Sequence, residues 1–95
     1  MTAPRTDLLK AIDLAFEDWD AAHRLVQRYE DDPTAAWIHA VLHKIEGDAG
    51  NSRYWYHRAN QRERFPDEPR TELAAIRGRV SPGGTTDGSR GPRAA

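Results

Sequence analysis

The sequence predicts an all-α domain of four to five antiparallel helices over residues 1–80, followed by a disordered tail over residues 81–95. Apolar residues recur every three or four positions through most of the first 80 residues, as they do along one face of a helix. No segment alternates apolar with polar residues, so no sheet is expected. The tail contains four glycines, two prolines and no large apolar residue, and it cannot offset the entropy lost on ordering.

The first two helices are predicted by capping residues and by the apolar stripes that follow them. Thr6 or Asp7 offers a side-chain oxygen that can cap the first helix, which is expected to break near residues 17–19. Asp18 or Asp20 can cap the second helix in the same way. The buried side of the second helix is expected to consist of Ala21, Ala22, Leu25, Val26 and Tyr29.

A third helix is predicted between Asp32 and Gly47. Proline fits the first turn of a helix, so Asp32 can act as the cap of a helix that begins at Pro33. Gly47 is expected to stop the helix in a left-handed conformation that glycine adopts at little cost. Between them lies a broad apolar face made of Ala36, Trp37, Ala40, Val41, Leu42 and Ile45.

A fourth helix is expected over residues 51–65, with Asn51 or Asp48 as its cap. The stretch FPDEP then forms a turn bracketed by two prolines. A fifth helix follows over residues 70–80, where large apolar residues again occur at helical spacing. Together these elements give two helical hairpins and a final helix.

Three adjacent aromatic residues, Tyr54, Trp55 and Tyr56, stand in the otherwise polar fourth helix. Consecutive helix positions point about 100° apart, so three neighbouring rings cannot share one face. Trp55 and Tyr56 are expected at the core seam of the hairpin, and Tyr54 is expected to face another side.

The second helical pair resembles a tetratricopeptide repeat, and the domain is therefore predicted to be helical-repeat-like. Asp18 and Asp48 occupy corresponding places in two units that are 30 residues apart, a period typical of such arrays. The resemblance covers residues 8–66, but the first unit lacks the early aromatic residue and only two units are present. The string GDAGNSRYWYHRA is also similar to a motif of small bacterial proteins, a likeness that implies no activity. The residues that carry the repeat-like pattern are Trp37, Ala40, Gly47, Asp48, Ser52, Trp55, Tyr56, Ala59 and Pro66.

The resemblance implies a non-catalytic protein-interaction module, in which the first helix of each pair lines a concave surface that holds a peptide or partner helix. Self-association is the alternative use of an apolar flank, because two units are fewer than a solenoid usually needs. Aromatic and arginine side chains dominate the energetics of interfaces. The residues expected to contact a partner on this ground are Tyr54, Arg53, Arg58 and Trp37.

A second hypothesis, of a different class, is a small-ligand or metal site, or a minor enzyme, built from His39, His43, Glu46 and His57. His39 and His43 are four residues apart, which places both imidazoles on one face of the third helix. No HExxH motif is present, and histidines that simply pack in the core are the ordinary alternative. The two hypotheses differ in whether the imidazoles converge on one point.

The composition and the motifs that are missing exclude several further classes of function. The chain has 14 basic and 15 acidic residues, so no nucleic-acid partner is expected. It has no cysteine, which excludes disulfides and thiolate metal sites. No signal-like or membrane-spanning apolar run is seen, so a cytoplasmic protein with no membrane partner is expected. No nucleophile or phosphate-loop motif occurs, and we expect neither catalysis nor a cofactor.

Overall fold

The computed structural model describes residues 2–80, and over this range the all-α prediction is confirmed. No strand occurs within these residues. The expected tail, residues 81–95, lies outside the described residues. The elements are α1 (Arg5–Leu14), α2 (Trp19–Gln27), α3 (Pro33–Glu46), α4 (Ala49–Arg58), the 3-10 turn η1 (Arg62–Arg64) and α5 (Pro69–Val80).

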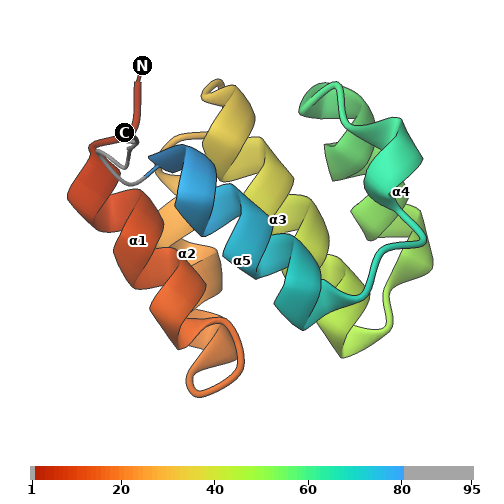
Figure 1. Ribbon diagram of the computed structural model, residues 1–95, viewed down its shortest axis with the longest axis horizontal. Coiled ribbons are helices and arrows are strands. Elements are labelled where there is room, and N and C mark those ends of the chain that lie inside the picture. Colours follow the sequence, from red (N-terminus) through yellow and green to blue (C-terminus); the bar gives the residue numbers. More distant parts are fainter. Residues whose placement is uncertain (1, 81–95) are drawn as a thin grey trace, which may run out of the picture.

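Helix α3 is the centre of the domain. It contacts each of the four other α-helices, with α4 and α2 beside it and α5 and α1 on its remaining sides (Figure 1). Every residue from Ala35 to His43 is buried as a result. Four alanines, one on α2 and three on α3, let the helices approach closely, because small side chains permit short distances between helix axes. They are Ala22, Ala35, Ala36 and Ala40, all of which are almost fully buried.

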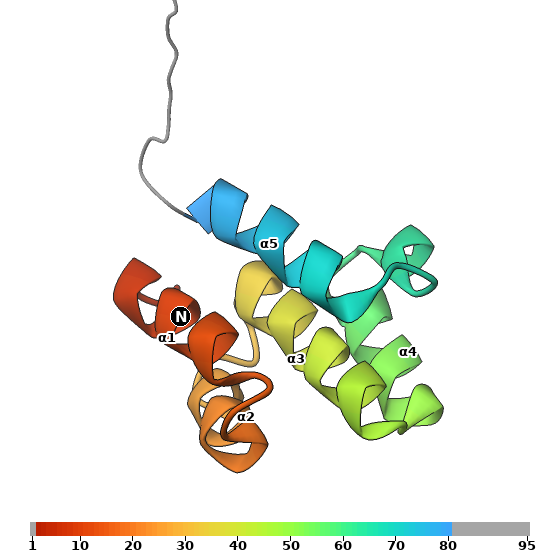
Figure 2. The same cartoon turned by 60° about the horizontal axis from the view of Figure 1, so that its bottom comes forward.

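Helix α5 lies across α1 and α3 rather than continuing a row of hairpins (Figure 2). The first helices of the two pairs, α1 and α3, would line the concave surface of a tetratricopeptide array. Here α5 covers them, and its Leu73 and Ile76 are buried in the shared core. Helix α5 therefore packs on the two helices that the resemblance assigns to the concave surface.

Three aspartates cap helices as the sequence predicts. The Asp18 carboxylate accepts a hydrogen bond from the amide of Ala21 at 3.2 Å, and the Asp48 carboxylate accepts one from Asn51 at 3.2 Å. The Asp32 carboxylate accepts two, from the amides at positions 34 and 35, both at 2.9 Å. Its second oxygen also accepts a hydrogen bond from the amide of Ala3, which fixes the N-terminal segment to the start of α3.

The predicted start and end of α1 are wrong. The helix begins at Arg5, after Pro4, and neither Thr6 nor Asp7 caps it, because both lie within its first turn. Asp7 instead accepts a hydrogen bond from the Tyr29 hydroxyl, which links α1 to the turn after α2. The helix ends at Leu14, earlier than the apolar pattern suggests.

The predicted end of α4 is also wrong. The helix stops at Arg58 because Asn60 adopts a left-handed conformation, with φ of 60°. The amide of Gln61 then donates to the Tyr56 carbonyl at 2.9 Å and the amide of Asn60 donates to the His57 carbonyl at 3.1 Å. This pair of bonds is the pattern that usually follows a glycine at a helix end, with asparagine in its place.

A buried ion pair joins α3, α4 and α5. The Glu72 carboxylate, fully buried, accepts hydrogen bonds from the Trp37 indole at 2.6 Å and from the Tyr56 hydroxyl at 2.6 Å and 2.7 Å. The Lys44 ammonium lies 2.7 Å from the same carboxylate. It also donates to the backbone carbonyls of residues 64, 65 and 67, at 3.3, 3.0 and 2.6 Å. Burial, together with the bond to Glu72, raises the pKa of Tyr56 well above its ordinary value.

Replacing Glu72 with alanine should lower the free energy of unfolding by about 3–5 kcal/mol, because Lys44 keeps a buried charge without its partner. Chemical denaturation at neutral pH measures the loss. The control is Glu63→Ala, an exposed carboxylate on η1, whose effect should stay within about 0.5 kcal/mol. Equal small effects for both variants would contradict the structural importance of the buried pair.

Two glycine-to-alanine substitutions should have opposite signs. Neither Gly47 nor Gly78 has an atom within 4 Å of the position that a Cβ would take, so space does not distinguish them. Gly47 has φ of 89°, and Gly47→Ala should cost about 1 kcal/mol in the free energy of unfolding. Gly78 lies within α5, and Gly78→Ala should add about 0.5–1 kcal/mol. Thermal unfolding of the two variants provides the comparison.

Candidate functional site

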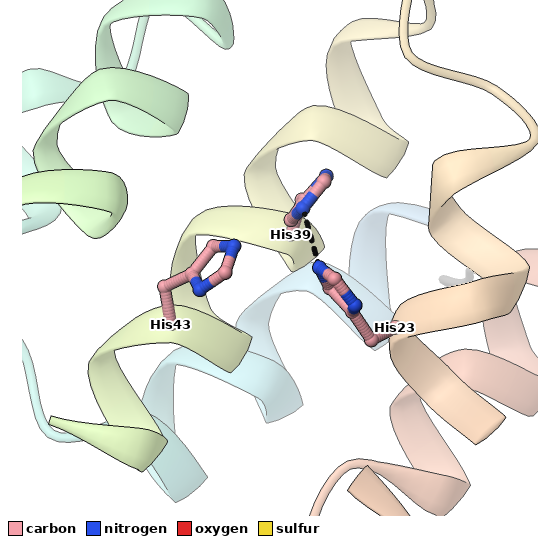
Figure 3. A group of neighbouring side chains, drawn as sticks. All are labelled: His23, His39 and His43. Carbon is pink, nitrogen blue, oxygen red and sulfur yellow. Dashed lines mark hydrogen bonds between the residues drawn. The ribbon is translucent and has the colours of Figure 1, made fainter. Parts of the chain in front are cut away.

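Three histidines converge between α2 and α3. His23 comes from α2, and His39 and His43 come from successive turns of α3 (Figure 3). The Nε2 atoms of His23 and His39 are 3.0 Å apart. One ring nitrogen of each of the three residues lies within 4.8 Å of the other two. We call these three residues the histidine cluster.

Two tryptophans hold the histidine cluster in place. The Trp19 ring stacks on His23 with the ring centroids 4.6 Å apart, and the Trp55 ring stacks on His39 at 3.9 Å. The Trp19 indole donates a hydrogen bond to the backbone carbonyl of Leu42 at 2.7 Å, which anchors the first turn of α2 to α3. Rings fixed in this way have little freedom to turn away from one another.

Glu46 orients His43. Its carboxylate lies 2.7 Å from Nδ1 of His43, one helical turn away on α3. A carboxylate at this distance favours a proton on Nδ1, which leaves the lone pair on Nε2. In Figure 3 the rings of His39 and His23 lie on the side of His43 away from its Cβ atom. Metal-binding histidines commonly have such a carboxylate on the nitrogen that does not bind the metal.

The surroundings of His23 and His39 favour the neutral form of both imidazoles. Burial, together with the neighbouring His23 and His43, lowers the pKa of His39 to about 3. Burial also lowers the pKa of His23, followed by the charge of His43, while Glu46 and Asp20 act in the opposite direction. Neutral imidazoles have the free lone pairs that a metal ligand or a hydrogen-bond acceptor needs. Nδ1 of His39 is buried and has no hydrogen-bond partner among the described residues.

The spacing of the ring nitrogens is close to what a metal ion requires. Zinc lies about 2.0–2.1 Å from imidazole nitrogens, so two ligands of a tetrahedral site are about 3.3 Å apart. The closest pair in the cluster is slightly nearer than this, and the widest separation is at most 4.8 Å. Side-chain rotations that move the ring nitrogens by about an ångström would bring all three to ligand distance. A second group, His43, Glu46 and Asp48, is less suitable, because Asp48 caps α4 and Glu46 contacts His43.

The structure brings together three of the four residues in the sequence-based metal hypothesis. His39, His43 and Glu46 lie together, whereas His57 is exposed on α4 and belongs to neither group. His23 takes the place that the hypothesis gave to His57. The spacing of Trp19 and His23, four residues apart on α2, was a local hint, but only the packing of α2 on α3 reveals the contact.

The four residues expected to contact a partner are distributed over different surroundings. Trp37 is buried, with 3% of its surface exposed, and belongs to the core. Tyr54 is 50% exposed, and the Arg58 guanidinium donates to its hydroxyl at 3.1 Å. Arg53 is exposed and lies over the Phe65 ring, 4.6 Å from its centroid.

The comparisons with known proteins leave the family open. Family models, curated proteins and solved structures were each compared with this chain, and none gave a match. The resemblance to tetratricopeptide repeats therefore stays a prediction. Within residues 2–80, no helix is long and apolar enough to cross a lipid bilayer.

The stability of the metal-free protein should fall as the pH drops below 6.5. The pKa of His39 is about 3 in the folded chain and about 6.5 when unfolded, so the unfolded chain binds more protons between these values. A histidine whose pKa is lower in the folded chain reduces the free energy of unfolding by up to about 1.4 kcal/mol for each pH unit of acidification in this range. Denaturation in the presence of a chelator, between pH 7 and pH 4.5, measures the slope. His39→Gln should reduce this slope, and a slope that it leaves unchanged would contradict the assignment. His57→Gln, at an exposed position outside the histidine cluster, is the matched control for this measurement.

Proposed function

We propose that this protein binds a transition-metal ion through His23, His39 and His43. The observation that carries the proposal is the convergence of three ring nitrogens from two helices within 4.8 Å. Glu46 supports it, because its contact with Nδ1 of His43 directs the Nε2 lone pair of that ring to the metal. The proposed role is binding, and no reaction is assigned to the site.

The chemistry of the donors favours a particular group of metals. Imidazole nitrogens suit zinc, copper, nickel and iron, whereas magnesium and calcium prefer oxygen ligands. Three protein ligands leave a fourth position for water or another small ligand in a tetrahedral site. The low pKa values of His23 and His39 keep their lone pairs available at neutral pH.

Simple packing is the alternative explanation, and the histidine cluster fits it less well. A core position that served packing alone would be satisfied by an apolar side chain, without the cost of burying polar nitrogens. Instead, three imidazoles from two helices bring a ring nitrogen each within 4.8 Å of the other two. An ion bound at the Nε2 atoms of His23 and His39 would compensate the burial of those two nitrogens.

A protein-interaction role remains a second proposal, and the outer face of α4 supports it. Tyr54 is one of two large apolar residues exposed among the described residues, and it lies beside Arg58. Helix α5 packs on both α1 and α3, so a partner would use this outer face instead.

Titration with Zn²⁺ or Co²⁺ at neutral pH tests the metal proposal. We expect one ion per chain. An ion at 100 times its dissociation constant should raise the free energy of unfolding by about 2.7 kcal/mol. Tetrahedral binding of Co²⁺ would also strengthen its visible absorption. His23→Gln, His39→Gln and His43→Gln should each abolish the saturable binding, and Glu46→Gln should weaken it by about 10- to 100-fold.

His57→Gln is the matched control for that titration, since His57 lies on α4 outside the histidine cluster. It should leave metal affinity unchanged. Binding that is lost in His57→Gln but kept in His23→Gln would reject the assignment of the three ligands. The absence of any saturable binding would reject the metal proposal as a whole.

A further inference from the structure

A pocket of about 340 Å³ lies beside α4 where the chain turns through η1. We call it the η1 pocket. None of its lining residues belongs to the histidine cluster. It is lined by Arg53, Tyr56, Arg62, Glu63, Phe65 and Pro66.

The floor of the η1 pocket is apolar and well supported. The rings of Tyr56 and Phe65 pack edge to face, with centroids 5.9 Å apart and an angle of 84° between their planes. The Lys44 ammonium lies 5.1 Å from the centroid of the Tyr56 ring and 6.0 Å from that of the Phe65 ring. Because Lys44 is bound to Glu72 and to backbone carbonyls, it holds this floor rigidly in position.

The rim of the η1 pocket carries an excess of positive charge. Two guanidinium groups, Arg53 and Arg62, stand against the single carboxylate of Glu63. The Arg53 guanidinium already lies over Phe65, 4.6 Å from the ring centroid. Arginine binds carboxylates through two parallel hydrogen bonds. An apolar floor with arginines at its edge therefore complements an apolar group that is attached to a carboxylate.

The pocket between α1 and α5 differs from the η1 pocket in its balance of charge. Its two arginines are matched by two carboxylates, and Arg77 forms an ion pair with Asp13. Arg70 lies over the Phe16 ring, 4.0 Å from its centroid. The charges at that pocket are balanced, so it offers no comparable preference for an anion.

The exposure of the η1 pocket indicates what kind of molecule it holds. Arg53, Arg62, Glu63 and Pro66 are exposed, so the rim does not enclose its occupant. Small-molecule sites usually bury about 70–90% of their ligand, which this rim cannot do. A polypeptide end can leave such a pocket through its open side. When the last residue of a polypeptide is apolar, it combines an apolar side chain with the terminal carboxylate. Capture of a terminal carboxylate is a recurring mode of peptide recognition.

We infer that the η1 pocket binds the C-terminal residue of a partner polypeptide. An apolar side chain rests on the partly exposed Phe65, behind which Tyr56 is fully buried, and the terminal carboxylate is bound by Arg53 and Arg62. The inference rests on the interaction role proposed above, for which it gives a surface distinct from the face around Tyr54 and a class of partner, and it is independent of the metal proposal.

Two peptides that differ in one group test the inference. Acetyl-Gly-Gly-Gly-Phe with a free carboxylate and the same peptide with a C-terminal amide are titrated into the full chain by heteronuclear NMR. The free acid should give saturable shifts around Arg53 and Phe65, with a dissociation constant on the order of 1 mM or lower. The amide should bind at least about tenfold more weakly, because it loses the charged hydrogen bonds to arginine.

Arginine variants then assign the contact. Arg53→Gln and Arg62→Gln should each weaken the free-acid peptide by about tenfold. Arg5→Gln is the control, since Arg5 is an exposed arginine on α1. Thermal unfolding of each variant establishes that the fold is intact.

Each other outcome rejects the inference in a distinct way. Equal binding of acid and amide would show that the carboxylate is not recognised. Phenylacetate that binds as tightly as the peptide, with the same shifts, would identify a small acid as the ligand instead. No saturable shift would reject the η1 pocket while leaving the exposed face around Tyr54 as the place for a partner, and Zn²⁺ binding would be unaffected.

Discussion

The Glu72 carboxylate enters the core from α5 and accepts hydrogen bonds from two residues of α3 and one of α4. A buried charge is tolerated only when it is paired and fully hydrogen-bonded, so this arrangement requires all three helices at once. Lys44 extends the requirement to the connection between α4 and α5, since it binds three backbone carbonyls there. A rigid floor for the η1 pocket and a fixed position for α3 both follow from this one constraint.

The position of α3 in turn decides where the histidines meet. This helix is buried on all sides, so His39 and His43 face the interior rather than solvent. The indole of Trp19 fixes α2 by its bond to the Leu42 carbonyl, and His23 is carried to the same point. The candidate metal site is therefore a product of helix packing, with one ligand from the first hairpin and two from the second.

Local features of the structure could be predicted from the sequence, and non-local ones could not. Asp32 with Pro33 and Gly47 mark the two ends of α3 through contacts within a few residues, so the pattern was sufficient. Asn60 was missed because asparagine adopts a left-handed conformation far less often than glycine does. His23 contacts His39, 16 residues away, and its spacing from Trp19 does not indicate which residue on another helix it meets. Glu72 was not predicted in the core, because a charged residue beside Leu73 normally faces water.

The placement of α5 also has a consequence for how the domain forms. In a linear repeat array, each unit contacts its neighbours only, and stability accumulates unit by unit. Here the last helix closes against the first and third, so the contacts that complete the core join residues more than 25 positions apart. During synthesis, Lys44 and Trp37 emerge well before the carboxylate that satisfies them. The core that joins α3, α4 and α5 is therefore complete only after α5 has been synthesised, and we expect residues 2–80 to unfold as one cooperative unit.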